Sequence, residues 1–100
     1  MYSTEEEIQK ALQDYMAEAG GMHASWYVGT CEHPRTALFG HHRVETDSDW
    51  WMFKRAASPE EARDVRHYFV RVLGTDGWAD GTEQAADYVY AYRKSAHTCP

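Results

Sequence analysis

Three short aromatic runs constrain the fold most, because each has the composition of a β-strand. They span residues 25–31, 50–55 and 87–93, and aromatic and β-branched residues favour strands. A helical pattern precedes the first run, and helical segments separate the three runs from one another. The predicted order is therefore α-β-α-β-α-β, which indicates an α+β domain. Because helices lie in both connections between strands, we expect a mixed sheet of about three strands packed with two or three helices.

The first helix is predicted from a start signal, a periodic apolar pattern and a stop signal. Ser3 followed by Glu6 matches a capping box. Apolar residues then recur at helical spacing until Gly20, where glycine favours a helix end. Residues 1–20 are thus expected to form an amphipathic helix with an acidic outer face.

Two further helices are predicted between the aromatic runs. Residues 58–61, Ser-Pro-Glu-Glu, combine an N-cap serine, a proline at the first helical position and a capping-box glutamate. The helix they open is expected to end at Gly74 and to bury these residues: Ala62, Val65, Tyr68, Phe69 and Val72. A shorter helical segment begins at Pro34, with Leu38 and Phe39 expected on its buried side.

The side-chain patterns of the later two strands give their expected surroundings. Residues 50–53 are apolar on both faces, which predicts a central strand or a partner covering the second face. Tyr88, Tyr90 and Tyr92 alternate with small residues and share one face of the last strand. Such a face suits a stacking platform for bases, but core packing against a helix is the favoured interpretation.

Length and composition predict one domain over residues 1–100. Hydrophobic residues make up 43% of the chain and aromatic residues 14%, enough for a single core. No apolar run approaches the roughly 20 residues that cross a bilayer, so we expect no membrane association. Cys31 and Cys99 give no disulfide framework, and two free thiols favour a cytoplasmic location.

The net charge of −6 is unevenly distributed. Residues 1–32 carry one lysine against six acidic residues, whereas residues 33–71 carry seven basic residues against six acidic ones. The middle of the chain is where a polyanion is least repelled. Any nucleic-acid binding is therefore expected to be weak and local.

Residues 26–29, Trp-Tyr-Val-Gly, followed by Arg35 and then by His41 or His42, resemble the second half of the GIY-YIG nuclease signature. The segment 58–70 is similar to the next helix of that family, and the resemblance covers about residues 25–73. It implies metal-dependent cleavage of DNA phosphodiesters, with Tyr27, Arg35 and His42 as candidate catalytic residues. For a nucleic-acid interface we expect these residues: Trp26, Arg35, Arg43, Arg66 and Trp78.

The chain departs from the family pattern at two points. No GIY-like strand precedes residue 26, and Arg66 stands where the family places its metal-binding glutamate. A cation at that position cannot recruit Mg²⁺, so a metal requires Glu61 or Asp64 as a substitute. We therefore expect a degenerate domain that binds nucleic acid weakly, with little or no nuclease activity and no cofactor. Mg²⁺ is expected only if the chain is an active nuclease.

A second hypothesis comes from a different class of function. The acidic first helix, or the glycine-rich loop that carries Trp78, is suited to a small acidic protein-protein interaction module such as an inhibitor or accessory factor. Cys31, His33, His41 and His42 lie close in sequence but lack the paired spacing of a zinc site, which favours ordinary surface roles. Neither hypothesis fixes the oligomeric state.

Overall fold

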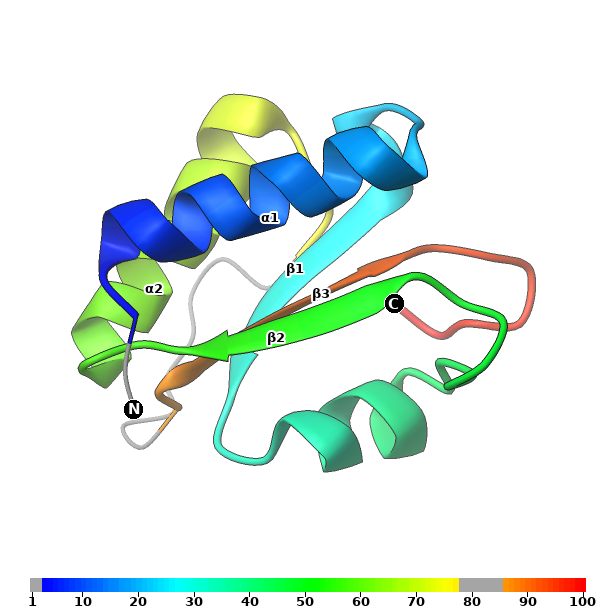
Figure 1. The fold of residues 1–100 in the computed structure, drawn as a ribbon. Helices are drawn as coiled ribbons and strands as arrows, with labels where there is room; N and C mark the ends of the chain where they lie inside the picture. The colour runs from blue at the N-terminus through cyan, green and yellow to red at the C-terminus, as the bar shows by residue number, and fades with distance from the viewer. Residues whose placement is uncertain (1–2, 78–85) are drawn as a thin grey trace.

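The computed structural model describes residues 3–77 and 86–100, and it confirms an α+β domain. Helices lie on both sides of one open sheet, with α1 and α2 on one face and a shorter helix on the other (Figure 1). No helix in the described part of the chain is long and apolar enough to cross a membrane. The elements in chain order are α1 (Glu5–Ala19), η1 (His23–Ser25), β1 (Trp26–Cys31), η2 (Thr36–His41), β2 (Trp51–Arg55), α2 (Pro59–His67), η3 (Tyr68–Leu73) and β3 (Tyr88–Arg93).

The three strands pair in the order β1-β3-β2, and both pairings are antiparallel. The prediction of a mixed sheet was therefore wrong for these strands. β1 and β2 are joined by a helical connection and run in the same direction, but β3 lies between them, so they do not pair. Among the described residues, parallel contact is limited to isolated bridges, one of which joins Tyr27 of β1 to Asp76.

The main core lies between the sheet and the layer formed by α1, α2 and η3. α1 begins one residue later than predicted: Thr4 caps it and forms the capping box with Glu7, in place of Ser3 and Glu6. α2 begins at the predicted Ser58 cap, and η3 ends at Gly74 in the left-handed conformation. The buried core residues are Ile8, Leu12, Met16, Trp26, Val28, Ala56, Ala62, Val65, Phe69, Val89 and Ala91. Val72, expected in this core, is exposed.

A second apolar cluster fills the other face of the sheet. Tyr88, Tyr90 and Tyr92 point to this face, as predicted, and η2 covers part of it with Ala37 and Leu38. Tyr90 and Tyr92 are buried, which confirms core packing for these two, whereas Tyr88 is only half-buried at the margin.

The apolar pattern of β2 predicted a central position or a covered second face. The central position is wrong, because β2 is an edge strand, but its second face is partly covered from η2. Trp51 and Phe53 lie on the η2 side and are half-buried, next to Phe39. The edge is partly capped: the Trp51 amide donates to the Tyr15 hydroxyl of α1, and the Ser3 amide donates to the Arg55 carbonyl. Apolar residues on both faces of this strand thus reflect packing on one side and a half-exposed aromatic surface on the other.

Candidate functional site

His42 follows η2 and is held inside the second cluster by hydrogen bonds at both ring nitrogens. Its Nδ1 lies 2.6 Å from the Cys99 carbonyl oxygen and its Nε2 lies 2.7 Å from the Tyr90 hydroxyl. A carbonyl only accepts, so Nδ1–H donates to Cys99 and Nε2 accepts from Tyr90. The Tyr92 hydroxyl lies 3.0 Å from the same Nδ1. Burial lowers the pKa of His42, so the ring is neutral at pH 7.

Tyr27 stacks against the two buried tyrosines and the histidine. Its ring centroid lies 5.2 Å from that of Tyr92, 6.1 Å from that of Tyr90 and 4.6 Å from that of His42. Burial raises the pKa of all three tyrosines, and they are therefore neutral hydroxyls at pH 7.

Gly29 makes room for this arrangement. An added Cβ at this position would lie 2.5 Å from the Tyr90 hydroxyl oxygen and 2.6 Å from Cζ of the same ring. The glycine that the family resemblance assigns to the signature is therefore required here by the close approach of the Tyr90 ring.

The hydrogen bonds form a continuous chain from Tyr90 through His42 to the Cys99 carbonyl, and the Tyr27 ring stacks beside this chain. Such a chain has the chemistry to pass a proton inward, with the neutral imidazole as the acceptor. However, Tyr27 is only 8% exposed and Tyr90 only 5%. This series of hydrogen bonds therefore does not reach the protein surface. Its role in the structure is to fix η2 and the C-terminal segment on the sheet.

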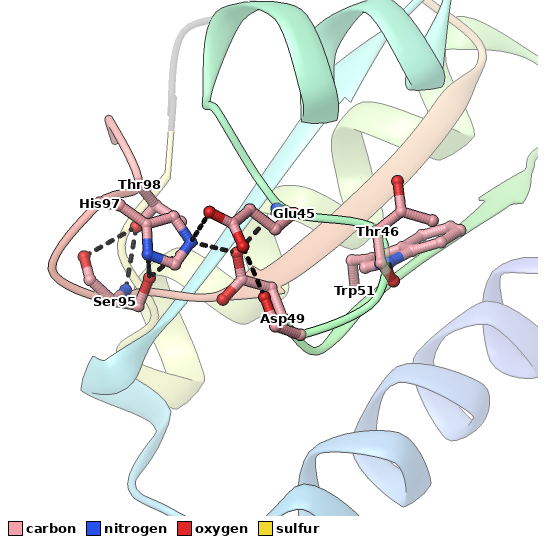
Figure 2. A network of polar contacts seen from close by, with 8 residues as sticks. Glu45, Thr46, Asp49, Trp51, Ser95, His97 and Thr98 are labelled. Carbon is pink, nitrogen blue, oxygen red and sulfur yellow. Dashed lines mark hydrogen bonds and ion pairs between the residues drawn. The ribbon is translucent and has the colours of Figure 1, made fainter.

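A surface network holds the C-terminal segment against the loop that precedes β2 (Figure 2). The Cys99 amide donates to the His42 carbonyl. Two residues earlier, His97 Nε2 lies 2.6 Å from the Asp49 carboxylate and 3.9 Å from Glu45, and this hydrogen bond raises the pKa of His97. The imidazole thus ties the segment to the loop that precedes β2.

Arg35 does not lie beside Tyr27. It precedes η2 and reaches the opposite edge of the sheet, where its guanidinium carbon lies 5.6 Å from the centre of the Phe53 ring. Two hollows adjoin this stack. One, of about 530 Å³, lies between α1 and β2, and the other, of about 400 Å³, lies between residues 33–36 and the rings of Phe53 and Tyr88. Arg35 and Phe53 line both hollows.

The other predicted interface residues are scattered. Trp26 is fully buried in the main core, and Arg66 is buried with a hydrogen bond of 2.8 Å to the Thr30 hydroxyl, so neither is placed to contact nucleic acid. Arg43 is exposed and adopts a positive φ of 56° after His42. Trp78 lies outside the described residues. Of the five, Arg35 and Arg43 are therefore at the surface.

The two acidic residues that might replace the missing metal ligand lie on the other face of the domain. Burial raises the pKa of Glu5 on α1, and the nearby negative charges of Asp64 and Glu61 on α2 raise it further. The α1–α2 layer is separated from Tyr27 and His42 by the sheet. Within residues 3–77 and 86–100, no group of three or more His, Cys, Asp or Glu side chains is arranged to hold a metal ion.

The sequence did not predict which aromatic residues contact His42 or which lie beside Arg35. Tyr90 and Tyr92 were identified as a shared strand face, but their contact with His42 depends on which strand pairs with β1. Phe53 and Tyr88 became neighbours of Arg35 through the same pairing. The chain matches no known protein-family model, no curated protein and no solved structure.

Proposed function

We propose that this protein is a degenerate GIY-YIG-like domain that binds nucleic acid weakly and has little or no nuclease activity. The observation that carries the proposal is the placement of Arg35, an exposed cation stacked on a half-buried aromatic ring between two open hollows. A guanidinium in this position pairs with a phosphate while its stem and the ring beneath it contact a base or sugar. The middle of the chain, which carries Arg35, is also where a polyanion meets the least repulsion.

A strand from another part of the chain occupies the place beside β1 where the family has its GIY-like strand. The family signature calls for an aromatic strand before residue 26, and here β3 pairs with β1 and brings Tyr90 and Tyr92 against Tyr27. An aromatic neighbour is thus supplied from the other end of the sequence. We infer the cytoplasm as the location, from the two free thiols.

Weak or absent cleavage follows from the separation of the candidate catalytic groups. Tyr27 and His42 are buried with their rings in contact, and His42 is hydrogen-bonded to Tyr90. Arg35, in contrast, lies on Phe53 at the far edge of the sheet. Phosphodiester cleavage needs a positioned nucleophile and a cation together where charge develops on the phosphate. Glu61 and Asp64 do not hold a metal ion near Tyr27, because they lie beside α1 on the other face of the sheet.

Fluorescence anisotropy with a labelled oligonucleotide at low and physiological salt tests the proposal. We expect weak binding at low salt that Arg35→Ala reduces further, with a shallower salt dependence because one phosphate contact is lost. Arg63→Ala is the matched control, since Arg63 is an exposed arginine on α2, on the opposite layer. Equal losses for the two variants would show that binding is nonspecific and would contradict the proposal.

A cleavage assay with Mg²⁺ or Mn²⁺ tests the second half of the proposal. We expect no metal-dependent cutting of duplex or single-stranded DNA. Cutting that Tyr27→Phe abolishes, while binding is retained, would establish an active nuclease and refute the assignment as a degenerate domain.

A further inference from the structure

We propose that the surface beside β2 binds the unstacked bases of a single-stranded nucleic acid. This surface, the aromatic shelf, consists of Trp51, Phe53 and Tyr88 with the guanidinium groups of Arg35 and Arg55. The inference rests on the proposed function and names its substrate class and site.

The rings of the shelf form a connected series along the edge of the sheet. Trp51 and Phe53 are nearly parallel, with centroids 6.2 Å apart and planes inclined by 15°. Phe53 then meets Tyr88 edge to face at 5.9 Å. All three are half-buried, so each keeps part of its ring available. Rings in such a series present successive surfaces on which bases stack, irrespective of base identity.

Two arginines flank this series: Arg35 just before η2, and Arg55 at the end of β2. The guanidinium carbon of Arg35 lies 5.6 Å from the Phe53 centroid, and that of Arg55 lies 5.7 Å from the Tyr88 centroid. Asp87 holds Arg55 in place through a hydrogen bond of 2.9 Å. Guanidinium planes stack on bases and pair with phosphates, so these two groups serve both parts of a nucleotide.

The space on the two sides of the Arg35–Phe53 stack fits flat ligands. The hollow beside Tyr88, about 400 Å³, and the hollow beside Trp51, about 530 Å³, are each within the range of small-molecule sites. Both are open to solvent next to Arg35. Successive bases of one strand can therefore occupy the two hollows with the arginine between them.

The charges of the hollows set the expected path of the phosphates. Among the described residues, those lining the hollow beside Tyr88 include Arg35 and His33 and no acid. The hollow beside Trp51 includes Lys54 but also Asp14 and Glu18 of α1. Phosphates are thus expected on the Arg35 side, away from α1, which leaves base faces toward the rings.

A single strand fits this shelf better than a duplex. In a duplex the base faces are covered by neighbouring pairs, and only base edges and phosphates reach a protein surface. Stacking on Phe53 or Tyr88 needs a free base face, which a flexible single strand offers without an unpairing cost.

The test compares four labelled probes of about 12 nucleotides, a length that covers a small single-strand site. The probes are oligo-dT, oligo-U, an abasic strand with the same sugar-phosphate backbone, and a duplex. We expect oligo-dT or oligo-U to bind more tightly than both the abasic strand and the duplex. Phe53→Leu and Tyr88→Leu should each weaken binding of the pyrimidine strand by about fivefold or more.

Tyr68→Leu is the matched control, because Tyr68 is a half-buried aromatic residue in η3, on the opposite layer. It should leave binding unchanged. Thermal unfolding verifies that the variants fold. An NMR titration of the unmodified protein tests the same site without any substitution. In that titration the Trp51 indole N–H, which donates to the Thr46 carbonyl, should shift with oligo-dT and not with the abasic strand.

The outcomes separate this inference from the proposed function. Equal binding of all four probes, unaffected by Phe53→Leu, would overturn the stacking site while leaving weak polyanion binding intact. No binding of any probe at low salt would overturn both. A concentration-dependent dimer that Phe53→Leu abolishes would assign the shelf to a second copy of this chain and would also overturn the inference.

Discussion

Two conservative substitutions in the buried cluster test the hydrogen-bond pattern around His42. Tyr90→Phe removes the hydroxyl that donates to Nε2, and this nitrogen has no other partner among the hydrogen bonds of the described residues. Tyr92→Phe removes a hydroxyl 3.0 Å from Nδ1, but that nitrogen keeps its shorter bond of 2.6 Å to the Cys99 carbonyl. Both changes leave the ring in place, so apolar packing is held constant.

The expected losses in free energy of unfolding differ about fourfold. Leaving a buried acceptor unsatisfied costs about 1–3 kcal/mol, and we expect about 2 kcal/mol for Tyr90→Phe. Tyr92→Phe leaves no buried group unsatisfied, so only the net contribution of one hydrogen bond to the free energy of unfolding is lost. We expect about 0.5 kcal/mol, at the low end of the range for such a bond. In a domain of this size these values lower Tm by roughly 8–16 °C and 2–4 °C.

Urea denaturation followed by circular dichroism measures both variants against the unmodified protein, with the m-value checking that two-state unfolding is preserved. The double variant should lose about the sum of the two single losses or less, because both hydroxyls act on one ring. Equal losses, or a larger loss for Tyr92→Phe, would refute the assigned tautomer and with it the direction of the hydrogen-bond chain.

Three further predictions concern the same region. In an NMR titration of ring C–H signals, His42 should titrate below the ordinary histidine pKa of about 6.5 and His97 above it; equal midpoints would contradict the two environments. Since the folded pKa of His42 is lowered, its share of stability is complete above pH ~6.5 and is lost as the pH falls through the folded pKa. The raised pKa of His97 gives the opposite pH dependence: the stability that it adds is complete below pH ~6.5 and is lost as the pH rises through the folded pKa. His97→Gln should remove this loss of stability at rising pH, measured by denaturation curves at several pH values. Gly29→Ala should lower the free energy of unfolding by about 1–3 kcal/mol, because its Cβ would clash with the Tyr90 ring, and Tyr90→Ala in the same background should relieve that clash; a stable Gly29→Ala variant would show that the ring is free to move.

The positions of the helices and strands could be predicted because their signals are local. The Ser58 cap, the stop at Gly74 and the alternating tyrosines of β3 each act within one element, and all three were confirmed. The order of the strands could not be predicted in the same way. A helical connection fixes neither strand direction nor strand order: β1 and β2, joined through η2, run in the same direction, whereas β2 and β3, joined through α2 and η3, are antiparallel.

The candidate site was predicted less well, because its contacts depend on that strand order. Tyr27 and His42 do meet, at 4.6 Å between ring centroids, and the resemblance placed both in one site. Arg35 was expected beside them, but the course of η2 carries it to the edge strand. The Cys99 carbonyl had no sequence signal at all, since any residue supplies a backbone acceptor.

The buried cluster and the aromatic shelf are connected through η2. His42, at the C-terminal end of this short helix, is bonded to Tyr90 and to the C-terminal segment, while Leu38 is fully buried in the middle. With one end fixed in this way, the other end holds Arg35 over Phe53. A neutral, fully bonded imidazole suits this anchoring role better than it suits catalysis, since a general base must be reached by its substrate. Changes at Tyr90 should therefore weaken oligonucleotide binding as well as stability, although Tyr90 itself lies beneath the surface.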